Sequence, residues 1–120
     1  MRLWIGMKFP SLNEYINAER RHRMIAAKMK KEWTTHVKIA AQREDCYISE
    51  DEFPVKVHFI IHEENKRRDI DNVSAMVSKF CLDGLVAAGT MPDDSQKYVN
   101  KIECDLVIDG KVGVEILINE

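Results

Sequence analysis

Residues 66–96, KRRDIDNVSAMVSKFCLDGLVAAGTMPDDSQ, contain five aspartates, four basic residues and one predicted helix. Three bases lead into Asp69 and Asp71, an apolar helical segment follows, and Asp93 and Asp94 stand beyond it. Clustered carboxylates repel one another, and a divalent cation such as Mg²⁺, which takes oxygen ligands, can hold them together. Bases packed against these acids favour a substrate that carries negative charge. The stretch therefore predicts metal-dependent chemistry on phosphate.

The apolar part of this stretch predicts a helix from about residue 72 to residue 88. Gly89 follows as the first residue past the helix, and Pro92 stands shortly after it, which is a typical stop signal. A helix of that length extends about 25 Å. The two aspartate pairs can therefore meet only if the loop through Met91 folds back along the helix.

The same helix has one polar and one apolar side. Asn72, Lys79 and Asp83 fall within about 40° of one another around the helix axis. A lysine and an aspartate four residues apart in a mostly apolar helix favour a helix whose outer face lines a charged site. The opposite side should face the core and carries Val73, Val77, Phe80, Cys81, Leu85 and Ala88.

Alternating apolar residues predict strands on both sides of this helix. Residues 1–9 and 54–62 alternate before it, and residues 97–108 alternate after it. Asp109-Gly110 is a two-residue hairpin signal, so residues 112–118 should form a strand that returns beside the preceding one.

A second helical segment precedes the strand at residues 54–62. Ser11 and Glu14 have the spacing of a capping box, which predicts one long helix from about residue 12 to residue 42 with at most one break. The order β-α-β-α-β-β indicates an α+β domain, with a small mixed sheet and two helices on one face. The length fits a single domain over residues 1–120.

Composition excludes several classes of protein. Residues 11–43 carry eight Lys and Arg against three Glu, a net charge of +5, and the rest of the chain carries −7. This asymmetry suits one basic face and one acidic pocket rather than a uniformly basic surface. Three widely spaced cysteines without a CxxC pattern argue against a disulfide framework or a structural zinc site. Without a signal peptide or a run of about 20 apolar residues, the chain is expected to be soluble and cytoplasmic.

Simpler interpretations of the acidic stretch stay open. Asp71 is a favoured residue type for a helix N-cap. Asp93-Asp94 after a proline is also typical of a turn. Lys79 and Asp83 could form an ordinary surface ion pair. On this view the chain is an α+β dimer whose acids are caps and turns.

Several of these features occur together in one known family. The motifs Arg68-Asp69-Ile70-Asp71-Asn72, Lys79 followed by Asp83-Gly84-Leu85, then Gly89 and Asp93-Asp94, resemble the RusA family of Holliday-junction resolvases. Members of that family are small, dimeric, Mg²⁺-dependent endonucleases of bacteria and their phages. In compact members the lysine stands four residues after the second aspartate. Here Ala75 occupies that position, and Lys79 lies one helical turn further on.

The resemblance implies a role for each matching residue. Asp69, Asp71 and Asp94 match the metal-site carboxylates, which would bind Mg²⁺, with Mn²⁺ as a substitute. Lys79 matches the functional lysine of the family. Arg68 matches a basic residue implicated in DNA contact. Supporting positions are Asn72, Asp83 and Asp93, with Asp93 the less favoured member of its pair.

The expected reaction is hydrolysis of DNA phosphodiester bonds by paired, symmetric nicks at a four-way junction. Two nicks need two active sites and hence a homodimer, with Met76 and Leu82 assigned to its interface. The cell would be bacterial or phage-infected. The alternative is a nucleic-acid-binding protein of the same fold that does not cut. The bases expected to hold the DNA backbone are Lys66, Arg67, Arg68, Arg20, Arg21 and Arg23.

Overall fold

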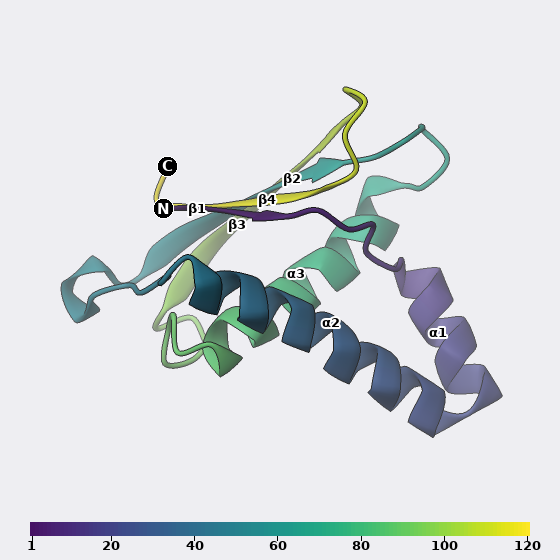
Figure 1. Cartoon of the computed structure of the whole chain (residues 1–120), viewed down its shortest axis with the longest axis horizontal. Helices are drawn as coiled ribbons and strands as arrows, with labels where there is room; N and C mark the ends of the chain where they lie inside the picture. The colour runs from purple at the N-terminus through teal and green to yellow at the C-terminus, as the bar shows by residue number, and fades with distance from the viewer.

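A computed structural model describes all 120 residues as one mixed sheet whose helices lie on one side of it (Figure 1). The predicted α+β class and the order of strands and helices are confirmed, except that the first helical segment forms two helices. No helix combines the length and the apolar character needed to cross a bilayer. The elements are β1 (Arg2–Ile5), α1 (Leu12–Arg21), α2 (Arg23–Arg43), a 3₁₀ turn (Glu50–Glu52), β2 (Val55–His62), α3 (Ile70–Ala87), β3 (Val99–Val107) and β4 (Gly113–Ile118).

The long helix predicted for residues 12–42 is broken at His22. This residue is extended, with φ −170° and ψ 134°, and it caps both helices. Its backbone N–H donates to the Ala18 carbonyl at the end of α1. Its ring Nδ1 accepts from the backbone N–H of Met24 at 3.0 Å. The capping box at the start of α1 is confirmed, because the Glu14 N–H donates to Ser11 Oγ at 3.2 Å.

The sheet has the order β1-β4-β2-β3, so the predicted hairpin between the last two strands is wrong. β3 pairs with β2 in parallel, and β4 runs antiparallel between β1 and β2. Asp109 and Gly110 do lie where the chain reverses, and Gly110 has φ +86°. However, the connection passes the end of β2 instead of joining neighbours. A turn signal fixes a local conformation but does not choose the partner of a strand.

The core lies between the sheet and the paired helices α2 and α3. Phe59 of β2 and Phe80 of α3 are fully buried there, and the other predicted core-facing residues of α3 are buried with them, except Ala88, which is half-buried. Met76 and Leu82 are only 6% and 8% exposed, because they pack inside this same core. The prediction that these two residues serve a dimer interface is therefore wrong.

α2 and α3 pack in unusually close contact at Gly84. A Cβ atom at this position would lie 2.4 Å from Cβ of Val37 and 3.0 Å from the carbonyl oxygen of Thr34. Only glycine fits without moving one helix. This contact sets how α2 lies beside α3, and so which side chains of α2 reach the acidic residues.

Candidate active site

Asp69 and Asp71 lie at the start of α3, and we call them the N-terminal pair. The helix begins at Ile70, two residues earlier than predicted, so Asp69 is the N-cap residue and Asp71 lies in the first turn. The Asp69 side chain makes no capping hydrogen bond, and both aspartates are exposed. The positive end of the helix dipole favours carboxylates here. Both are therefore available to a ligand, and the N-cap is Asp69 rather than Asp71.

Asp93 and Asp94 lie beyond the other end of α3, at a cavity of about 380 Å³ that we call the Asp94 cavity. Lys79 and Asp83 of α3 also line it, and their charged groups are 3.4 Å apart. The loop from Gly89 is held in place by Met91, which is only 1% exposed. The structure thus brings the functional lysine expected from the resemblance together with Asp94 and Asp83.

Two lining residues of the Asp94 cavity were missed by the sequence analysis. Lys30 and Thr34 of α2 both face it, and the buried Oγ1 of Thr34 has no hydrogen-bond partner. Their spacing of four residues places them on one face of the helix. The sequence shows that face, but it does not show that the face meets α3.

The N-terminal pair lies at one end of α3, and the Asp94 cavity lies along the other half, from Lys79 onward. An 18-residue helix extends about 27 Å. The structure contains no group of three or more His, Cys, Asp or Glu side chains close enough to hold a metal ion. The predicted site of Asp69, Asp71 and Asp94 is therefore not assembled within one chain. The N-terminal pair alone still fits magnesium, which is often held by one or two carboxylates, with waters and substrate phosphates completing its shell.

Most of the predicted DNA-binding bases are exposed. Lys66 and Arg67 lie in the loop that enters α3, next to the N-terminal pair. Arg20, Arg21 and Arg23 surround the break between α1 and α2. These side chains can reach a phosphate backbone without first leaving another partner, because none of the five makes an ion pair in the structure.

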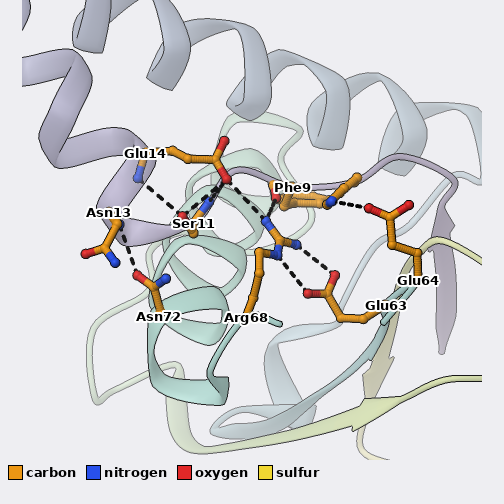
Figure 2. A network of polar contacts seen from close by, with 9 residues as sticks. Phe9, Ser11, Asn13, Glu14, Glu63, Glu64, Arg68 and Asn72 are labelled. Atoms are coloured by element: carbon orange, nitrogen blue, oxygen red, sulfur yellow. Dashed lines mark hydrogen bonds and ion pairs between the residues drawn. The ribbon is translucent and has the colours of Figure 1, made fainter. Parts of the chain in front are cut away.

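Arg68 is placed differently, because its side chain points into the protein (Figure 2) and is only 14% exposed. Nε and Nη2 each donate to one carboxylate oxygen of Glu63 at 2.7 Å, and Nη1 donates to the Phe9 carbonyl at 2.7 Å. The hydrogen bond with Glu63 is the main reason why the pKa of Arg68 is raised. Glu63, the first residue after β2, is itself buried, with only 4% of its surface exposed.

Asn72, a supporting position in the resemblance, connects α3 to α1. Its side-chain oxygen accepts a hydrogen bond from the backbone N–H of Asn13 at 3.0 Å (Figure 2). This N–H belongs to the first turn of α1, where backbone donors have no partner within the helix. The two helix starts are thereby held side by side, at the end of the molecule that carries the N-terminal pair.

A comparison with protein-family models matches residues 7–119 to the family described as Endodeoxyribonuclease RusA. The chain belongs to the RusA family. The match includes the N-terminal pair, the Asp94 cavity and the exposed bases, and it confirms the family resemblance of the motifs. A search among curated proteins found no match. The acids and bases described above are therefore those of a chain in an endodeoxyribonuclease family.

Proposed function

We propose that this RusA-family chain is a magnesium-dependent endonuclease that resolves four-way DNA junctions by paired nicks. The observation that carries the proposal is the N-terminal pair: two exposed carboxylates, free of capping bonds, beside the exposed bases Lys66 and Arg67. A protein that only binds DNA gains nothing from carboxylates placed next to phosphate. Because the chain belongs to an endodeoxyribonuclease family, we expect these acids to take part in cleavage.

Each group has a role in phosphodiester hydrolysis. Asp69 and Asp71 would hold Mg²⁺, or Mn²⁺ in its place. When bound, the metal ion supplies Lewis acidity and an activated water. Lys79 would stabilise the charge that builds on the phosphate.

The exposed bases would hold the DNA backbone without reading its sequence. Lys66 and Arg67 lie next to the N-terminal pair and would hold the cleaved strand, and Arg20, Arg21 and Arg23 would contact a neighbouring arm. Contacts of this kind neutralise phosphates and release counterions, so binding should weaken steeply with salt.

We further propose that a second copy of the chain completes the site. Within one chain, Asp94 lies at the cavity beside Lys79 and Asp83, and it forms no three-residue metal group with Asp69 and Asp71. A twofold axis near the middle of α3 would set two such helices antiparallel, so that the partner's Asp94 approaches the N-terminal pair. Two identical sites result, as two symmetric nicks require.

The first test is the variant Asp71→Asn with a synthetic four-way junction. We expect loss of cleavage in Mg²⁺ with junction binding retained, because the amide keeps the shape of the side chain but is a poorer metal ligand. Asp51→Asn, an exposed aspartate of the 3₁₀ turn, is the matched control and should cut normally. Cleavage by Asp71→Asn at the wild-type rate would refute the metal assignment.

The second test distinguishes a shared site from a site within one chain. Asp71→Asn and Asp94→Asn should each be inactive alone. In a mixed dimer of the two variants, one shared site has both substitutions and the other has none, so mixing should restore single-strand nicking. If mixing restores nothing while each variant still forms dimers, the shared site is wrong.

One observation favours an alternative function, a DNA-binding protein of this fold that does not cut. The exposed bases Lys66, Arg67, Arg20, Arg21 and Arg23 would serve such a protein equally well. Incubation of the wild type with labelled junction DNA and Mg²⁺ separates the two functions, because only the enzyme releases nicked products.

A further inference from the structure

Arg68 connects four segments of the chain at the base of the N-terminal pair (Figure 2). Its two bonds to Glu63 reach the end of β2, and its bond to the Phe9 carbonyl reaches the segment between β1 and α1. Its Nη1 also lies 3.6 Å from Oε1 of Glu14, in the first turn of α1. Arg68 itself leads directly into Asp69. The guanidinium thus has hydrogen-bond or ion-pair partners within the protein on several sides.

The two aspartates lie between two anchored neighbours. Arg68 precedes them, and Asn72, which accepts from the Asn13 N–H at 3.0 Å, follows them. Both anchors attach to the segment that begins α1, and Arg68 also attaches to β2. The backbone of residues 69–71 therefore has little freedom, although the carboxylates themselves are exposed.

We infer that Arg68 is a positioning residue, which fixes the segment carrying Asp69 and Asp71 and does not bind a DNA phosphate. Binding a phosphate would require the guanidinium to leave Glu63, a carboxylate that is almost completely buried. A buried acid without its partner is strongly disfavoured. The fork of an arginine also matches a carboxylate with two parallel bonds, a geometry that lysine cannot reproduce. The part of this inference that concerns cleavage rests on the proposed function.

The first measurement is the salt dependence of junction binding in EDTA, which prevents cleavage. Each phosphate contact contributes about 0.9 to the slope of log affinity against log salt concentration. Arg67→Gln, at the exposed neighbour, should lower that slope by about 0.9. Arg68→Gln should leave the slope unchanged, and Arg68→Lys provides the same measurement if the glutamine variant does not fold. A slope that falls for Arg68→Gln or Arg68→Lys as it does for Arg67→Gln would overturn the inference.

The second measurement asks whether Arg68 acts through Glu63. Glu63→Gln should reproduce Arg68→Lys, with cleavage about 10–100-fold slower and a higher Mg²⁺ concentration for half-maximal rate, as for partners that orient metal ligands. Glu64→Gln is the matched control, because Glu64 is the exposed neighbour that pairs with Lys8, and it should cut normally. Wild-type behaviour of Glu63→Gln beside a defective Arg68→Lys would contradict the inference.

The two measurements separate failure of this inference from failure of the proposed function. If the wild type does not cut DNA, the proposed function fails, but the salt slope still tests Arg68 because it needs only binding. If the wild type cuts and the slope falls for Arg68→Gln, the proposed function survives and the positioning role of Arg68 fails. Thermal melting of each variant without DNA verifies that it is folded.

Discussion

Replacing Gly84 by alanine should push α2 away from α3 and destabilise the protein. The new Cβ would lie 2.4 Å from Cβ of Val37, about 1.4 Å short of an ordinary carbon–carbon contact of about 3.8 Å. Overpacking of this kind costs about 1–3 kcal/mol. Alanine also favours the helix over glycine by about 1 kcal/mol, which offsets part of that cost. A contact this short places the cost near the upper end of that range, so we expect a net loss of about 2 kcal/mol, or about 8 °C in Tm at about 4 °C per kcal/mol.

Urea denaturation and thermal melting of the wild type and Gly84→Ala measure this loss. The clash is with Val37, so the double variant Val37→Gly, Gly84→Ala gives a stronger test. In the Val37→Gly background only the 3.0 Å approach to the Thr34 carbonyl oxygen remains, so alanine at position 84 should destabilise much less than it does in the wild type. Ala75→Gly, at a half-buried position of the same helix, calibrates the propensity difference without a clash.

A Gly84→Ala variant that is as stable as the wild type, or more so, would show that α2 and α3 do not clash at this position. An effect of Gly84→Ala that is the same with and without the Val37 side chain would show that Val37 is not the residue that alanine meets. In either case the contact between α2 and α3 would not fix how Lys30 and Thr34 lie at the Asp94 cavity.

Two further predictions concern stability alone. Burial lowers the pKa of His62, but hydrogen bonds with Asp109 and Glu115 outweigh it and leave that pKa raised. The stabilisation from His62 should therefore be complete below about pH 6.5 and be lost as pH rises through the folded-state pKa. Urea titrations of wild type and His62→Gln at several pH values test this, and a stability difference that grows with pH would contradict it. Ser11→Ala removes the capping box of α1 and should cost about 1 kcal/mol in the same assay. Thr35→Ala, exposed within α2, is the control expected to change little, and equal losses for both would argue against the cap.

The sequence predicted the features that depend on neighbouring residues. The capping box at Ser11 and the stop at Gly89 are determined within one or two turns of helix, and both lie where they were expected. The core-facing side of α3 follows from helical periodicity and from the preference of apolar side chains for burial. The packing of α3 in the folded protein agrees with both.

Features that depend on distant segments were not predictable in the same way. Asp109-Gly110 indicated a reversal of the chain correctly, but the insertion of β4 between β1 and β2 depends on residues more than fifty positions away. Likewise, an arginine next to an aspartate looks like a DNA contact until Glu63 and the Phe9 carbonyl are seen around it. Met76 and Leu82 were assigned to a dimer interface because the sequence does not show how α2 packs on α3.

The sheet order also bears on how the protein folds while the ribosome makes it. β4 is synthesised after β1, β2 and β3, yet it separates β1 from β2. Until β4 emerges, β1 has no neighbour in the sheet, and one edge of β2 stays open. A nascent or prematurely terminated chain can form the parallel β2–α3–β3 unit but keeps an apolar strand edge exposed to other chains. Truncated products of this protein are therefore expected to aggregate or to be bound by chaperones.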